Sequence, residues 1–508
     1  MSFFNNSFLI KDVFSIFQAF LGAQLVITMI MVSFLQKIMP YFSFSRFILC
    51  HKLVRYLHPS DESLKQSSGK PVNNGGRRHK KDHSKSDVKN SGFNVPRNVD
   101  VQLEVAPVQP EDIIHLHYYP EFHWLIDFSI STLIVYAMTE FYYYWSPFAK
   151  AEINLKLNAI VSNLNILILS ALFYEFMHLI KFIDLNNKFR KILCSLTGMY
   201  FTNEATQGER SMTLVSGSSF FLLAMIVLIA DEKVLEFGLL DAQSSLSKTA
   251  AEVLKSYGIN ATAHASKLTF KFVLAVWSGL IGAFFTFPGM RGAKMHLDSL
   301  NYTEGSYFKR SLLHLNMFSM IIMVLLWVKP ISRDCLTTLS CSNTLKVPIM
   351  DDESFNSLRV YIIISIAMLR IILMPEYLQS YLNIAHDRMK QLKKEAGRIN
   401  SLELQRRVAR IFYYLCVVAL QYIAPVLIVL YLGLMLKTLG GYVWHPNFIE
   451  DCEYSSMTSN QTNSTDIFTK SLFRGVLNYA TWWCCYIHFS DHWSRIYILF
   501  IFFNCLID

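Results

Sequence analysis

Polar side chains inside the long apolar runs are the residues of this chain best placed to do chemistry, because an ionisable group is costly to bury in such a run. The third run holds the clearest set, whose members project within about 40° of one another on a helix or follow near its end. They are Asn154, Asn158, Asn165, Glu175 and His178. This stripe predicts a polar lining for an ion or proton path or, alternatively, hydrogen bonds between helices that only hold a bundle together.

Other charged residues in the apolar runs do not combine into one site. Asp127 and Glu140 lie near opposite ends of the second run, and their spacing projects them about 220° apart around a helix. Arg359, Arg370 and Arg410 lie within about two turns of a predicted run end, so we expect their guanidinium groups to extend to the interface.

Catalytic and metal-binding patterns are absent from the sequence. It has no GxxxxGK[ST], HExxH or GxSxG motif, and its Cys residues are scattered without metal-ligand spacing. His115, His117 and His123 are not completed by a Cys or carboxylate cluster. Glu175 and His178 are the one pair inside a run with general acid–base character. We therefore expect a protein that is not an enzyme and has no catalytic residue, metal or cofactor.

The composition is that of a chain that crosses a membrane several times. Of 508 residues, 52% are apolar and 17% are charged, and the mean hydropathy is +0.30, whereas a soluble domain carries about 25% charged residues. The 39 Phe, 25 Tyr and 8 Trp suit aromatic belts at two interfaces. We expect an all-α polytopic helix bundle in contact with lipid, and the net charge of +9 does not indicate nucleic-acid binding.

About nine spans, within a range of eight to ten, are predicted from windows of roughly 20 apolar residues. The windows are 13–39, 122–144, 157–180, 212–230, 268–288, 312–328, 355–375, 408–436 and 472–490, followed by a short run at 496–506. The first window lacks a small-residue cleavage site, so it is interpreted as a retained span.

The distribution of Lys and Arg predicts that the N-terminus lies outside, because basic loops stay on the cytoplasmic side. On this model the inside loops contain 29 basic residues and the outside segments contain 12. The inside loops are 40–121, 181–211, 290–311 and 376–410.

Sequons and cysteines in the outside loops agree with this orientation. N-x-S/T acceptors, which are modified on the lumenal side, occur at Asn260, Asn460 and Asn463. Of three cysteines on the same, oxidising side, Cys335 and Cys341 form the candidate disulfide, and free thiols are the alternative.

Two cytoplasmic segments are distinctive. Residues 58–112 have few large apolar residues and predict a disordered basic loop, whose run 77–85 could contact anionic lipid or simply be solvated. Residues 376–407 predict a basic amphipathic helix that docks on the protein's own spans, lies on the inner leaflet or binds a cytoplasmic partner. Its apolar stripe is Leu378, Leu382, Ala385, Met389, Leu392, Ala396 and Ile399.

Small residues in the fifth run predict close helix packing. Ser278 with Gly282, and Gly279 with Ala283, are spaced four residues apart. Such pairs allow a neighbouring helix to approach closely.

Several long strings resemble the transmembrane protein 161 family, closer to its B branch. They include S-K-L-T-F-K-F-V-L-A (266–275), I-G-A-F-F-T-F-P-G-M-R (281–291), V-A-R-I-F-Y-Y-L-C-V-V-A-L-Q-Y-I-A-P (408–425) and L-F-R-G-V-L-N-Y-A-T-W-W (472–483). The resemblance covers most of residues 20–483, and the last residues, from 484, depart from the family's usual ending.

The resemblance implies a multi-pass protein of the cell membrane that restrains potassium and calcium currents in excitable cells and so affects heart rhythm. The leading hypothesis is therefore a modulator that contacts an ion channel or calcium pump. The alternative is a transporter or channel with its own polar path along the third span. The plasma membrane is the favoured location, and the endoplasmic reticulum is the alternative.

The expected organisation has six parts. They are a leader, first span and juxtamembrane segment (1–57), the disordered loop (58–112), spans two to seven (113–375), the amphipathic helix (376–407), spans eight and nine with the glycosylatable outer loop 437–471 (408–490), and an atypical tail (491–508).

Overall fold

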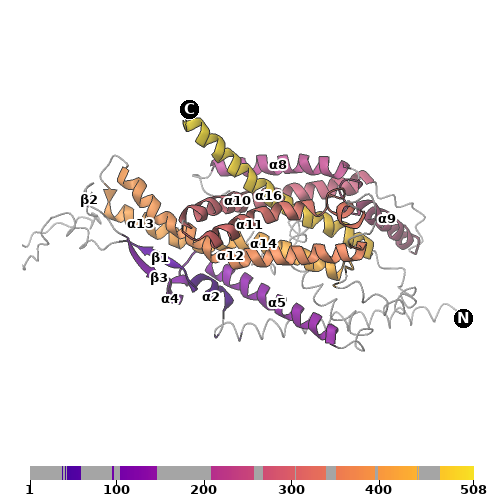
Figure 1. Cartoon of the computed structure of the whole chain (residues 1–508), viewed down its shortest axis with the longest axis horizontal. Helices are drawn as coiled ribbons and strands as arrows, with labels where there is room; N and C mark the ends of the chain where they lie inside the picture. Colours follow the sequence, from indigo (N-terminus) through magenta and orange to yellow (C-terminus); the bar gives the residue numbers. More distant parts are fainter. Residues whose placement is uncertain are drawn as a thin grey trace, which may run out of the picture.

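A computed structural model describes most of the chain as a bundle of long helices lying side by side (Figure 1). The described residues are 43–58, 94–95, 103–145, 207–230, 232–256, 267–303, 305–338, 350–394, 399–442 and 469–507, with positions 37, 41 and 444.

Seven long helices form the bundle and its flanks. They are α5 (Tyr119–Trp145), α8 (Gln207–Ile229), α10 (Lys267–Tyr302), α11 (Tyr307–Leu325), α12 (Asp352–Lys394), α14 (Leu415–Thr438) and α16 (Lys470–Ile507). The shorter elements are α2 (Phe44–Cys50), α4 (Pro110–Ile113), α9 (Leu239–Ser256), α13 (Ser401–Tyr413), the π-helical turn η3 (Asp334–Thr338), and the strands β1 (Val54–Leu57), β2 (Asn94–Val95), β3 (Glu104–Pro107) and β4 (Ile399–Asn400).

Five stretches of described helix are long and apolar enough to cross a membrane, which identifies the chain as a membrane protein. They are Ser211–Ile229, Lys267–Tyr302, Tyr307–Leu325, Asp352–Gln391 and Glu403–Thr438. The predicted window 157–180, and the window 13–39 apart from position 37, lie outside the described residues. The count of nine spans and the outside N-terminus therefore remain predictions.

Helix α14 lies at the centre of the bundle, in contact with α5, α10, α12 and α16. Its sequence is apolar on all sides, which is typical of a helix with no face toward water. Every residue from Leu415 to Leu436 is buried except Ala424 and Ile428. The centre of the described bundle is thus filled by one apolar helix.

Small residues bring α8 and α10 together. A Cβ atom added at Gly279 would lie 2.9 Å from Phe221 Cβ, and one added at Gly282 would lie 2.6 Å from Phe220 Cβ. Gly217 of α8 in turn faces Ala283. Gly279, Gly282 and Ala283 therefore lie where α10 contacts α8, and a larger side chain there would separate the helices. Ser278 instead lies toward α16, with its hydroxyl 2.8 Å from that of Tyr479.

The two ends of the bundle gather different loops. Figure 1 shows α2, α4, α13, β1 and β3 at the left end and α9 at the right end. At the left end, β1 pairs with β3, and the N–H of Val54 donates to Gln379 of α12 over 2.9 Å. At the right end, Leu235 pairs with Val328 in an isolated β-bridge. The described parts of the predicted inside loops thus share one end.

Helix α12 runs well beyond the predicted end of its span at residue 375, to Lys394. The predicted amphipathic helix at 376–407 is therefore not a separate element, because its first part is a direct continuation of the span through Pro375. Leu378, Leu382, Ala385 and Met389 are buried on it.

The rest of the predicted apolar stripe does not continue along this helix. Leu392 is the last of its members on α12, Ala396 lies outside the described residues, and Ile399 lies in β4, where it pairs with Val95. The predicted helical position of Ile399 is thus wrong, because strand pairing replaces the helix after Lys394.

Candidate functional site

A group of polar side chains is buried between five helices of the bundle, and we call it the buried polar cluster. It draws on α10, α11, α12, α14 and α16. Its members are His296, Asn316, Arg370, Tyr377, Tyr422, His488, Asp491 and His492.

Tyr377 of α12 is the hydrogen-bonding centre of this cluster. Its hydroxyl accepts a hydrogen bond from Asn316 Nδ2 over 2.7 Å and lies 3.1 Å from His296 Nδ1. Tyr422 of α14 packs its ring against Tyr377 with centroids 5.1 Å apart, and its hydroxyl donates to the carbonyl of Arg370 over 2.9 Å. The two phenols thus connect four helices through hydrogen bonds and one ring contact.

Arg370 places a permanent positive charge inside the bundle. Its side chain is 5% exposed, and its Nη2 lies 3.7 Å from the Met320 sulfur. Its Nε has no hydrogen-bond partner, and no ion pair joins it to a carboxylate among the described residues. An arginine cannot shed its proton in a protein, so this charge is stabilised mainly by surrounding dipoles, at a cost of several kcal/mol.

Helix α16 contributes His488, Asp491 and His492, which are all buried. Two glycines of α10 allow this close approach. A Cβ added at Gly289 would lie 2.5 Å from Asp491 Cβ, and one added at Gly292 would lie 2.9 Å from His492 Cε1. The crossing of α10 and α16 thus places three titratable side chains inside the bundle.

These groups are suited to holding an ion or moving a proton. Histidine is the side chain that changes charge near neutral pH, and chains of Asp and His act as proton relays in membrane pumps. Several buried polar atoms of the cluster lack a hydrogen bond: Arg370 Nε, His296 Nε2, Asn316 Oδ1, both ring nitrogens of His488, and Asp491 Oδ2.

A second buried arginine belongs to an ion-pair network at the other end of the bundle. Arg359 is 1% exposed, and its Nη2 lies 2.9 Å from Glu236 Oε2. Glu236 also pairs with Arg333. The Arg359 guanidinium lies over the rings of Phe355 and Trp327, 4.7 and 5.5 Å from their centroids. This network joins the segment before α9 to the segment after α11 and to α12.

Asp127 and Glu140 of α5 lie in two separate structural contacts. Asp127 accepts hydrogen bonds from the Ser45 N–H and the Ser43 hydroxyl, both over 2.9 Å, and Glu140 pairs with Lys437 of α14. The two carboxylates therefore tie different ends of α5 to its neighbours.

The contacts around Asp127 include a serine, a histidine and an aspartate. These are the residue types of a hydrolytic triad, but both oxygens lie near the same ring nitrogen. Ser45 Oγ is 2.6 Å and Asp127 Oδ2 is 3.1 Å from His123 Nδ1. A hydrolytic triad uses the two ring nitrogens for different partners. The geometry is therefore that of a cap that holds α2 against α5.

Many predicted site residues lie outside the described residues. These are the third-span stripe of Asn158, Asn165, Glu175 and His178, the sequons at Asn260, Asn460 and Asn463, and Cys341. Cys335 lies in η3 with an exposed, free thiol. Among the described residues, no group of three His, Cys, Asp or Glu could hold a metal ion.

The polar cluster itself was not predicted from the sequence. Arg359 and Arg370 were expected to extend to an interface, and this expectation is wrong because both face the bundle interior. A helical projection of α12 would have given the signal. The two residues are eleven positions apart, so they share a face within about 20°, and that face also carries Phe355, Ile363 and Met374, which are buried.

Comparison with known proteins places the whole bundle in one family. The family model described as "Predicted transmembrane protein 161AB" matches residues 19–500. The match continues past residue 484, where a departure from the family was expected. No solved structure matches the chain. Because the match spans nearly the whole chain, the protein belongs to the transmembrane protein 161A/B family.

Proposed function

We propose that this protein regulates potassium and calcium currents by contacting an ion channel or calcium pump within the membrane, without catalysing a covalent reaction. The observation that carries the proposal is the packed centre of the bundle. Helix α14 is buried from Leu415 to Leu436 on nearly every side, whereas a channel needs an axial path lined by polar groups or backbone carbonyls. A filled centre suits an accessory protein better than a pore.

The outer surface of the bundle supports this proposal. Helix α8 exposes a row of large apolar residues: Leu214, Val215, Leu222, Ile226 and Ile229. Such a row needs lipid or the spans of another membrane protein as its neighbour. The plasma membrane is the proposed location, where the regulated currents flow.

Two measurements on the full chain test the proposal. Whole-cell potassium and calcium currents are compared in excitable cells with and without the protein, and we expect the currents to be larger in its absence. The purified chain is then reconstituted alone in liposomes, where we expect no potassium or calcium flux. Flux from the purified chain, or unchanged currents in cells that lack it, would overturn the proposal.

The second candidate function is ion or proton movement by the protein itself, and the buried polar cluster favours it. Arg370, His488, Asp491 and His492 are ionisable groups inside the bundle, and such groups commonly mark ion and proton pathways. This candidate predicts a liposome flux that Asp491→Asn abolishes. The matched control is Trp493→Phe, because Trp493 lies two residues away on α16 and is half exposed.

A further inference from the structure

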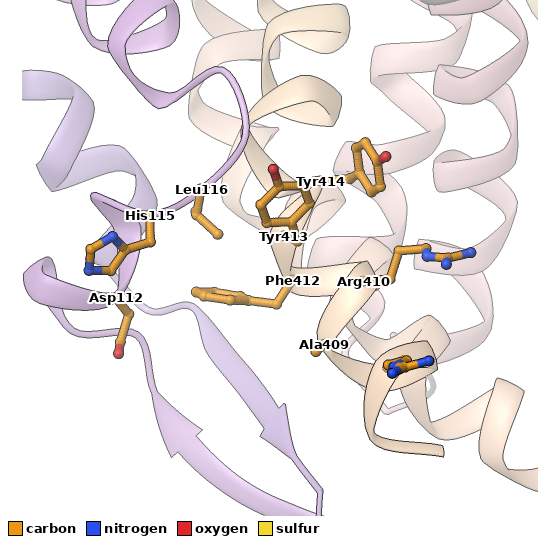
Figure 2. A pocket seen from close by; sticks show the side chains of 9 residues that line it. Asp112, His115, Leu116, Ala409, Arg410, Phe412, Tyr413 and Tyr414 are labelled. Carbon is orange, nitrogen blue, oxygen red and sulfur yellow. The ribbon is translucent and has the colours of Figure 1, made fainter. Parts of the chain in front are cut away.

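A pocket outside the polar cluster lies where α13 meets α14. Its volume is about 470 Å³, within the range of small-ligand sites. One wall comes from the segment around α4, with Asp112, His115 and Leu116. The other wall comes from α13 and the start of α14, with Arg406, Ala409, Arg410, Phe412, Tyr413 and Tyr414. In Figure 2, Phe412 projects toward His115 and Leu116, while Arg410 extends from the other side of the helix turn.

The charges around this pocket are unbalanced. Its one carboxylate, Asp112, already pairs with Arg55 at 2.9 Å. Arg406 and Arg410 are exposed and make no ion pair with a described carboxylate. Arg407, between them in sequence, is different, because it pairs with Glu403 over 2.6 Å. The pocket therefore presents two free guanidinium groups, which match the oxygens of a phosphate.

The position of the pocket indicates which phosphate compound binds. Helix α13 lays Leu404 and Val408 against Met389 of α12 and leaves its arginines exposed, which is the pattern of a helix lying at a membrane surface. The pocket ends at Tyr414, directly before the buried apolar residues of α14 begin. Tyr413 is 44% exposed, and aromatic rings of this kind sit at the headgroup level of a bilayer.

The strands before α13 connect this end of the bundle to a segment whose sequence is basic. Strand β2 pairs with β4 directly before α13. The sequence between β1 and β2 includes Arg77, Arg78, Lys80, Lys81 and Lys85. The loops at this end are those predicted to be cytoplasmic, and the cytoplasmic leaflet is the one that carries anionic lipid.

From these observations we propose that this pocket binds the phosphorylated headgroup of an anionic phospholipid of the cytoplasmic leaflet, with Arg406 and Arg410 contacting its phosphate oxygens. The aromatic wall of Phe412 and Tyr413 covers the apolar side of the headgroup. The ligand comes from the bilayer and not from solution, because the pocket opens at the junction of a surface helix and a membrane helix.

The test measures binding of a fluorescent phosphatidylinositol bisphosphate to the purified full chain in neutral nanodiscs. Basic residues near an anionic surface each strengthen binding by a factor of about five. We therefore expect the Arg406→Gln, Arg410→Gln double variant to weaken binding roughly 30-fold. The matched control is Arg407→Gln, on the same helix and also exposed, which should change binding less than about threefold because its charge is already paired.

Soluble inositol trisphosphate and inorganic phosphate, added as competitors, distinguish the two phosphate sources. We expect neither to displace the lipid at equal concentration. Displacement by either would mean that the pocket binds a free phosphate compound, and the lipid assignment would be wrong. An equal loss of binding in the Arg407 control would show a general charge effect and would also overturn the proposal. Size-exclusion chromatography and thermal unfolding of the double variant check that its lost binding is not lost folding, and an unfolded double variant with Arg406→Gln and Arg410→Gln single variants that bind as well as wild type would overturn the proposal.

Discussion

The two buried arginines of α12 offer the sharpest test of the packing argument. Arg359 and Arg370 lie on the same face of one helix, about 16 Å apart along its axis. They are similarly buried, at 1% and 5% exposure. Arg359 pairs with Glu236 and contacts two aromatic rings, whereas Arg370 has no described carboxylate partner. The same substitution should therefore have opposite effects at the two positions.

Arg370→Met should leave the free energy of unfolding unchanged or raise it by about 1–3 kcal/mol, because an apolar side chain of similar length replaces an uncompensated buried charge. Arg359→Met should lower it by roughly 2–4 kcal/mol, since it removes an ion pair, a hydrogen bond to the Leu326 carbonyl and two cation–π contacts. Glu236 keeps Arg333 as a partner, which limits this loss.

The measurement is thermal unfolding of the detergent-solubilised full chain, followed by tryptophan fluorescence and by size-exclusion chromatography. Ile372→Met, at an exposed position of α12, controls for the methionine itself. The expected order of Tm is Arg370→Met at or above wild type, and Arg359→Met clearly below it. If Arg370→Met destabilises as strongly as Arg359→Met, a partner compensates the Arg370 charge and the reasoning is refuted. A stable Arg370→Met variant with altered currents would show that the charge serves function at the expense of stability.

Three further predictions follow from described contacts. Gly282→Leu should lower the free energy of unfolding by about 1–3 kcal/mol or more, because the leucine side chain would overlap Phe220. A Tm equal to that of wild type would contradict the contact between α8 and α10. Burial raises the pKa of the Cys50 thiol, so its maleimide labelling should be slow at pH 7.5 and accelerate above pH 9. The exposed Cys335 should react before Cys50, and equal labelling rates at the two thiols would contradict the burial of Cys50. Asp127→Asn should lower stability by about 1–3 kcal/mol and increase proteolysis before α5, and unchanged proteolysis would argue against its capping role.

Local spacing predicted some of these contacts and could not predict others. The pairs Ser278–Gly282 and Gly279–Ala283 can be recognised in the sequence because helix periodicity places the members of each pair on one face. In the structure Gly279, Gly282 and Ala283 contact α8, and Ser278 contacts Tyr479 of α16. The polar cluster joins His296 to His492, which are far apart in sequence. Their proximity depends on how α10 and α16 cross, and no periodicity within one helix contains that information.

The error at Arg370 has a similar origin. Its distance from the predicted span end at residue 375 suggested that the guanidinium would reach water. Helix α12 continues to Lys394, however, and Tyr377 and Leu378 beyond that point are buried. The end of an apolar run in a sequence marks where side chains reach water only when no other part of the protein packs around the helix beyond that point.

The length of α12 has a mechanical consequence. Its 43 residues make a rod of about 64 Å, roughly twice the thickness of a hydrocarbon core. One end is fixed by the Arg359 network, and the other contacts β1 through Gln379 and Asn383. Pro375 removes a backbone hydrogen bond between these two ends. The helix can therefore bend near its middle, so the end held by the Arg359 network and the end that contacts β1 can tilt separately.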